Sequence, residues 1–97
     1  MSIIIERRFI VTSPVGLHLR PAVMLSQTAD HFDSTICVCR QETKADAKSA
    51  LSMILLDAGF GEAVTVTAQG HDAVPAMAAI EQLFQAGFSE QPLARTI

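Results

Sequence analysis

The 97-residue chain is predicted to adopt an α+β fold: a four-stranded antiparallel sheet with three helices on one face, in the order β-α-β-β-α-β-α. Two observations predict this fold. Segments with apolar residues at every second position alternate with segments whose apolar residues recur at helical spacing. Hydrophobic residues make up 49% of the chain, which suffices for one core in a single domain of this length.

The first strand is expected at residues 3–12, where apolar and polar residues are interleaved. Residues 13–16 have the composition of a turn. The first helix should follow over about residues 18–30. His31 stands at the end of this helix, where a cation suits the helix dipole, and we expect it at the surface. The core side chains of the helix should be Ala22, Leu25 and Ala29.

Residues 34–40 are predicted to form the second strand, because apolar residues alternate there with Cys37 and Cys39. A turn and a short third strand should follow within residues 41–45. Side chains two apart on a strand share a face without disulfide geometry, and two cysteines alone make a poor zinc site. We therefore expect two free thiols in a reducing compartment, with metal binding and redox sensing as the alternatives.

The second helix is expected over residues 49–56, which are apolar nearly all round. A helix that covers one face of a sheet in a small domain cannot bury its whole surface. We expect Leu51 and Ile54 to form an exposed stripe, with Met53 and Leu56 packed inward.

The last strand and the last helix are predicted from the same two patterns, alternation and helical spacing. Residues 63–68 alternate valine with threonine, which predicts a strand with one covered face that ends at Gly70. Asp72 should cap the third helix and Gly87 should end it. His71 is expected in an exposed loop, without a chemical role. The apolar stripe of this helix should be Met77, Ile80, Leu83 and Phe84.

Residues 1–90 are expected to form a single domain, and residues 91–97 lack periodicity and should fray. The net charge of −3 is not the positive charge expected of a protein that binds nucleic acid. The apolar runs are too short to span a membrane, and the start of the chain lacks the pattern of a signal peptide. We expect a cytoplasmic protein without nucleic-acid or membrane partners, and a monomer.

The stretch Gly-Leu-His-Leu-Arg-Pro-Ala at residues 16–22 is the candidate site. Proline is tolerated in the first helical turn, so Pro21 places His18 at or beside the N-cap. The free N–H groups of the helix, its dipole and Arg20 then suit an anion. A neutral imidazole is a nucleophile, and these positive groups would also stabilise a phosphoryl group on it. The alternative is a surface histidine that merely caps the helix.

This stretch resembles the active-site motif of the HPr family, the phosphocarriers of the phosphoenolpyruvate-dependent phosphotransferase system. Residues 47–49 and 64–70 also resemble family signatures, so the likeness covers about residues 3–90. Residues 55–57 and 83–88 resemble the nitrogen-branch relatives, NPr, more than the sugar-branch members. The resemblance implies an HPr-like open-faced β-sandwich, in agreement with the fold predicted above.

The resemblance implies a phosphoryl carrier rather than an enzyme. His18 would accept the phosphoryl group on Nδ1 from enzyme I, forming pros-phosphohistidine, and pass it to a IIA-type protein. Arg20 would be the phosphate clamp. No cofactor and no metal is required on this chain. The candidate partner-binding residues form an apolar rim, namely Leu19, Val23, Leu51 and Ile54.

Ser49 resembles the regulatory serine of the family, which a dedicated kinase (HPr kinase/phosphorylase) modifies where one exists. The alternative is a plain N-cap, a position that Asp46 could also fill. Leu19 departs from the small or polar residue usual at its position, which bears on the choice of enzyme I. Val15 replaces a polar residue that usually precedes the glycine of the active-site loop.

Three other functions compete with a nitrogen-branch carrier. The first is a sugar-branch HPr that feeds sugar transport. The second is a regulatory module that binds partners without transfer, for which His18 would be dispensable. The third is a small hydrolase with His18 as base, which is weakly supported because no local motif ties a nucleophile or carboxylate to it.

Overall fold

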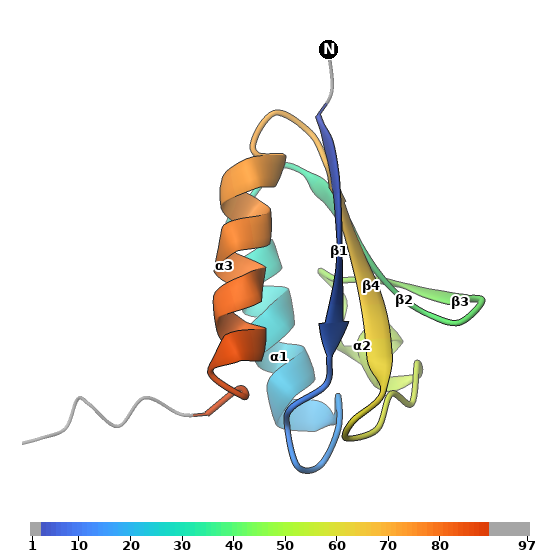
Figure 1. Cartoon of the computed structure of the whole chain (residues 1–97). Coiled ribbons are helices and arrows are strands. Elements are labelled where there is room, and N and C mark those ends of the chain that lie inside the picture. Colours follow the sequence, from blue (N-terminus) through green and yellow to red (C-terminus); the bar gives the residue numbers. More distant parts are fainter. Residues whose placement is uncertain (1–2, 90–97) are drawn as a thin grey trace, which may run out of the picture.

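The computed structural model describes residues 3–89 and confirms the predicted order of elements (Figure 1). The predicted tail at 91–97 lies outside the described residues. No helix in the described part is long and apolar enough to cross a membrane. The elements are β1 (Ile4–Ile10), α1 (Leu19–Ala29), β2 (Thr35–Arg40), β3 (Thr43–Asp46), α2 (Ala50–Ile54), β4 (Ala63–Gln69) and α3 (Ala73–Gln85).

The four strands form one antiparallel sheet in the order β1-β4-β2-β3. The late strand β4 therefore lies between β1 and β2, with Val66 opposite both Arg7 and Val38. Figure 1 shows α1 and α3 side by side against one face of the sheet. Alternate residues of the strands turn toward these helices. The inward side chains are Ile5, Phe9, Ile36, Val38, Val64, Val66 and Ala68.

The helical stripes predicted from spacing fill the core. Ala22, Leu25 and Ala29 of α1 are fully buried, and so are the predicted residues of α3 apart from the partly buried Leu83. The ring of Phe84 stacks on that of Phe9 with centroids 4.5 Å apart and meets Phe88 edge-on at 4.9 Å. This aromatic cluster fixes the end of α3 to the edge strand β1.

Helix α2 is shorter than predicted, and one of its exposed residues was assigned wrongly. It ends at Ile54, and Asp57 takes a positive φ of 56° that turns the chain away. Leu51 is exposed as predicted, but Ile54 packs partly against the core and Leu55 is the exposed residue instead. Leu55 is the C-cap residue and keeps helical backbone (φ −69°, ψ −13°), so it lies on the same face as Leu51, four residues earlier. Both inward residues are buried as predicted: Met53 and Leu56.

Asp72 occupies the predicted N-cap position of α3, but its side chain makes no capping hydrogen bond. Its carboxylate instead accepts the backbone N–H groups of Asp33 and Ser34, at 2.8 and 2.9 Å, and the Ser34 hydroxyl. His71 joins this cluster through a 3.0 Å ion pair with Asp33. A side chain at Gly70 would approach Ser34 Oγ to 2.6 Å. The carboxylate thus satisfies the buried Ser34 and ties together the loops before β2 and α3.

The cysteines are free, as expected, and both are half-buried on β2. Each alternates with an inward residue, so both lie on the sheet face turned away from the core. Cys37 stands opposite Asp46 and Thr67, and Cys39 stands opposite residues 44 and 65. The strand position is the predicted one.

Candidate functional site

His18 stands where the loop after β1 becomes α1. It is the N-cap residue, with extended backbone (φ −89°, ψ −159°), and its carbonyl accepts the Ala22 N–H at 2.9 Å. Its side chain makes no capping hydrogen bond and is exposed. The position predicted from Pro21 is correct, but the imidazole does not act as a cap. The ring is therefore accessible at the positive end of an eleven-residue helix.

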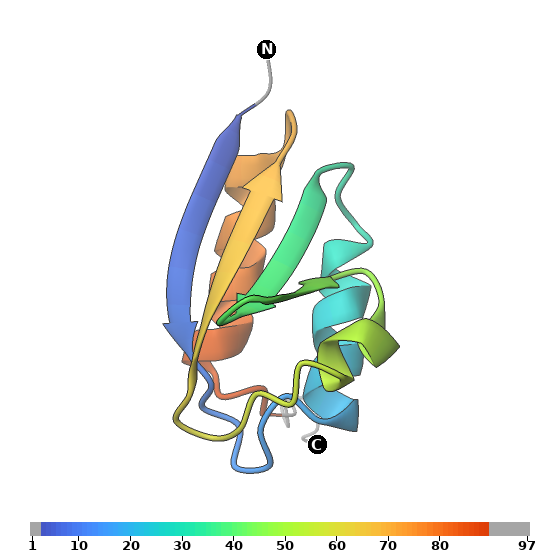
Figure 2. The ribbon, with the colours of Figure 1, turned by 90° about the vertical axis from the view of Figure 1, so that its right-hand side faces the viewer.

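The loop in front of His18 is held by backbone contacts with the segment that follows α2. Gly16 has φ +77°, and a Cβ there would lie 2.6 Å from the Ala58 carbonyl oxygen. The same oxygen accepts the Leu17 N–H at 2.8 Å, and Leu17 itself is buried. Figure 2 shows the two loops side by side at the lower end of the molecule. Glycine is required at 16 because only it combines this φ with so close an approach.

The segment that receives the loop is held in turn by an ion pair that sequence reasoning missed. Glu62 accepts hydrogen bonds from Arg40 Nε at 3.1 Å, from Arg40 Nη2 at 3.0 Å and from the Gly59 N–H at 2.6 Å. Arg40 Nη1 also donates to the Leu56 carbonyl at 3.3 Å. The bonds from Arg40 and Gly59 hold the pKa of Glu62 below its ordinary value, and the bond to Glu62 raises the pKa of Arg40. No local spacing signals this contact, because its two residues are 22 positions apart.

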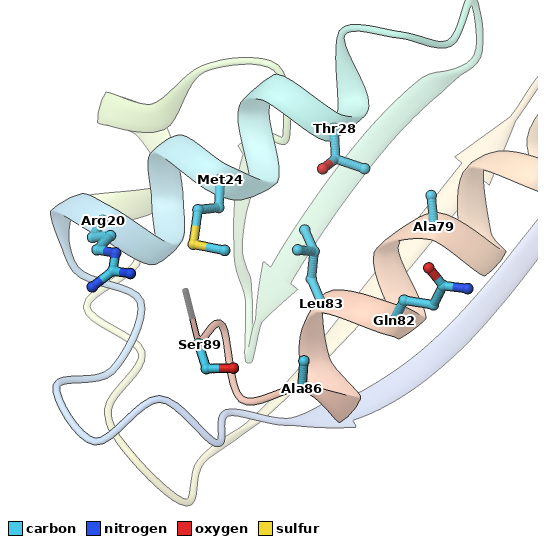
Figure 3. A pocket seen from close by; sticks show the side chains of 8 residues that line it. All are labelled: Arg20, Met24, Thr28, Ala79, Gln82, Leu83, Ala86 and Ser89. Carbon is cyan, nitrogen blue, oxygen red and sulfur yellow. The ribbon is translucent and has the colours of Figure 1, made fainter. Parts of the chain in front are cut away.

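Arg20 lies in the first turn of α1, exposed, at one end of a groove between α1 and α3 (Figure 3). The groove has a volume of about 540 Å³, and Met24 and Leu83 give it an apolar floor. The first turn of α1 contains no acidic residue, so nothing in that turn opposes an anion. The other lining residues are Thr28, Ala79, Gln82, Ala86 and Ser89.

The predicted apolar rim is only partly exposed. Leu19 and Leu51 are more than 60% exposed, whereas Val23 and Ile54 are half-buried. Helices α1 and α2 contact each other, so Leu19 and Leu51 come from adjacent elements. A hydrophobic side chain inside a turn has no periodic partner to bury it, and this signal could have found the large apolar residues that are exposed in turns. These are Val15, Leu55 and Phe60, which together with Leu19 and Leu51 we call the apolar surface.

The cluster of Asp33, His71 and Asp72 brings three side chains of metal-binding type within 4.8 Å of one another. Hydrogen bonds already occupy it. The Ser34 hydroxyl and two backbone N–H groups lower the pKa of Asp72, and the bond to Asp33 raises the pKa of His71. The cluster therefore acts as an ion-paired clasp between two loops.

Comparison with known proteins gives the family. The family model described as "PTS HPr component phosphorylation site" matches residues 5–86. The chain belongs to the HPr family. It is 38% identical to HPr of Treponema pallidum over 81 residues, which cover 84% of this chain and 92% of that protein. It is 37% identical to NPr of Shewanella violacea over 86 residues, which cover 89% and 94%.

The fold agrees with the family. The crystal structure of HPr-C-His from Thermoanaerobacter tengcongensis has a TM-score of 0.84 with this chain at 34% identity, covering 89% of this chain and 97% of that one. Family membership makes the chain a phosphocarrier of the phosphotransferase system and not a catalytic enzyme itself. It also implies partners of the enzyme I and IIA classes. The similar identities to an HPr and an NPr leave the branch of the system unresolved.

Proposed function

We propose that His18 accepts a phosphoryl group from enzyme I in the cytoplasm and passes it to a IIA-type protein. The observation that carries this proposal is the exposed, uncapped imidazole at the N-terminus of α1. The helix dipole and the first N–H groups favour negative charge at this point. The Arg20 guanidinium in the same turn adds a full positive charge.

The transfer is a displacement at phosphorus. The Nδ1 lone pair of a neutral His18 forms the new N–P bond while the bond from phosphorus to the donor breaks, and its electron pair stays with the donor. Arg20 holds the phosphoryl oxygens. The reverse displacement, by a nucleophile of the acceptor protein, restores His18. Such a step depends on positioning and charge stabilisation, and it uses no metal or cofactor on this chain.

The apolar surface is the proposed docking face for both partners. The carrier must bind, transfer and leave, which suits a small interface with a modest apolar centre. Leu19 and Leu51 carry over from the partner-binding rim predicted from the sequence, and Val23 and Ile54 lie at its half-buried edge. The exposed Leu55 extends it.

We assign the carrier to the nitrogen branch, with a sugar-branch HPr as the second candidate. The assignment is supported by the NPr-like residues at 55–57 and 83–88. Leu55 and Asp57 are exposed, so a partner protein could contact both side chains directly. Leu83 and Ala86 line the groove that ends at Arg20.

Phosphorus NMR tests the carrier and its branch together. The protein is incubated with phosphoenolpyruvate and either the sugar-branch or the nitrogen-branch enzyme I. We expect an acid-labile phosphohistidine signal that disappears in His18→Ala and persists in His31→Ala, a matched exposed histidine at the other end of α1. Faster labelling by the nitrogen-branch enzyme would support the branch. A signal that survives in His18→Ala would contradict the proposal, because another residue would then carry the phosphoryl group. No signal with either enzyme would favour a binding module.

Ser49 remains a prediction as a regulatory site. Its structural role is that of the N-cap of α2, where its Oγ accepts the Ser52 N–H at 3.2 Å. A phosphate on Ser49 would bring negative charge two residues before the exposed Leu51 and would oppose docking of a partner on the apolar surface.

A further inference from the structure

Strand β1 has a free edge that faces away from β4. In an antiparallel ladder both backbone groups of a residue point to the same side, and successive residues alternate sides. Val11 exchanges backbone hydrogen bonds with Glu62 and Gly61, and the Ile3 carbonyl accepts the Gly70 N–H, so odd-numbered residues face β4. No other described strand pairs with the opposite edge. The residues whose backbone groups face that edge are Ile4, Glu6, Arg8 and Ile10.

The side chains of these four residues lie on the sheet face turned away from the core. Their neighbours Ile5 and Phe9 pack inward, and side chains alternate along a strand. Ile4 is 62% and Ile10 48% exposed, which is unusual for isoleucine. The charged residues stand between them. Read along the strand, the order is apolar, negative, positive, apolar.

We propose that two copies of this chain pair edge to edge through antiparallel β1 strands, with a two-fold axis at Arg7. This register places Glu6 opposite Arg8 of the second copy and Ile4 opposite Ile10, each pair occurring twice. Every residue that faces the free edge meets another such residue, so the N–H and C=O groups of both edges become hydrogen-bonded. The exposed apolar and charged side chains are matched in the same step.

Charge selects this register over its neighbours. Moving the axis by one residue keeps the edge-facing residues paired, but it opposes Glu6 with Glu6 or Arg8 with Arg8. In the favoured register Arg7 meets Arg7 at a non-hydrogen-bonded position, where both long, exposed side chains can turn into solvent. Arg7 Nη1 donates a long hydrogen bond of 3.4 Å to the Glu6 carbonyl, and in the pair of strands a backbone N–H of the second copy takes its place.

The pairing is independent of phosphoryl transfer. Figure 2 shows β1 along one edge of the sheet and α2 on the opposite side of the molecule, so the part of the apolar surface on α1 and α2, namely Leu19 and Leu51, stays open. A single pair of strands makes a small interface, so the association is weak and depends on concentration. The monomer expected from the sequence is then the form present in dilute solution.

Sedimentation equilibrium of the full chain tests the pairing by charge exchange. The wild type should associate as the concentration rises toward the millimolar range. Glu6→Arg and Arg8→Glu should each weaken association at least tenfold, and the double variant should restore it. Glu6 and Arg8 face threonines 67 and 65 of β4, so neither single variant breaks an ion pair to that strand. Equal behaviour of all four proteins would overturn the proposal.

Amide hydrogen exchange locates the interface and checks the fold of each variant. With rising concentration, exchange should slow at the edge-facing amides and stay unchanged at residues 5, 7 and 9, which already face β4. A dimer formed by exchange of β1 between copies would leave the edge-facing amides unprotected and would overturn edge pairing. The amides expected to slow are those of Ile4, Glu6, Arg8 and Ile10.

Discussion

Gly16 and Gly61 show how the same backbone conformation has different consequences at two positions. Both have positive φ, of 77° and 86°. A Cβ at Gly61 would meet no atom within 4 Å, whereas a Cβ at Gly16 would collide with the Ala58 carbonyl oxygen. That oxygen also fixes Leu17, the residue before His18. The requirement for glycine at 16 therefore belongs to the positioning of His18, the proposed phosphoryl acceptor.

Alanine substitutions at these glycines form a matched pair. Gly61→Ala should lower the free energy of unfolding by about 1–2 kcal/mol, the cost of a non-glycine residue at positive φ. Gly16→Ala adds a backbone collision and should cost roughly 3 kcal/mol or more. It should also slow phosphorylation of His18, because the loop must shift. Urea denaturation and the labelling rate measure both effects. Equal losses in the two variants would show that the contact with Ala58 relaxes freely.

At the scale of the element, α2 divides its few residues between the core and the proposed docking face. Met53 is completely buried, and Leu51 two positions earlier is 67% exposed. Ile54 lies between these extremes, in partial contact with the core. So short a helix gains little stability of its own and depends on this packing.

Three substitutions separate the two roles of α2. Leu51→Asp should change the free energy of unfolding by less than about 0.5 kcal/mol, as at an exposed site, and should weaken binding to enzyme I. Met53→Ala should cost about 2–5 kcal/mol through the cavity that it leaves. Ile54→Asp should lose stability as well as binding. Urea denaturation and isothermal titration with enzyme I measure the effects. Unfolding of Leu51→Asp would place that residue in the core.

At the scale of the whole molecule, side-chain bonds between distant segments hold the loops around the sheet. Arg40 and Glu62 join the end of β2 to the loop that supports Gly16. Asp72 joins the loop before β2 to the start of α3. The carboxylates of Glu62 and Asp72 have pKa values below their ordinary 4.5 and 3.8, so their folded state favours the ionised form.

The pH dependence of stability follows from the direction of these shifts. Glu62 and Asp72 stabilise the fold above their ordinary pKa values, and this contribution is lost as the pH falls through the lower folded values. The pKa of His71 is raised, so its contribution is complete below 6.5 and is lost as the pH rises through the folded value. Urea midpoints measured from acid to mildly alkaline pH should show both limbs. Glu62→Gln and Asp72→Asn should each reduce the fall of the urea midpoint at acid pH. An unchanged fall would show that other carboxylates cause it.

The sequence by itself determined the order of the elements, the helical stripes of α1 and α3, and the position of His18 at the start of α1. These features depend on spacing within one segment, where residues three or four apart share a helix face and a proline marks the first turn. The same local stretch carried the likeness to the HPr family.

The tertiary structure alone decided the partner of Asp72, the pairing of Arg40 with Glu62, and the exposure of Leu55 in place of Ile54. The bonds of Asp72 and Arg40 join residues 38 and 22 positions apart, and no local pattern encodes such a meeting. Aspartate is a favoured N-cap residue, but the carboxylate of Asp72 instead binds the backbone N–H groups of Asp33 and Ser34 in another loop. The exposure of residues 54 and 55 depended on which face of α2 packs against the core, and a segment that is apolar nearly all round does not specify that face.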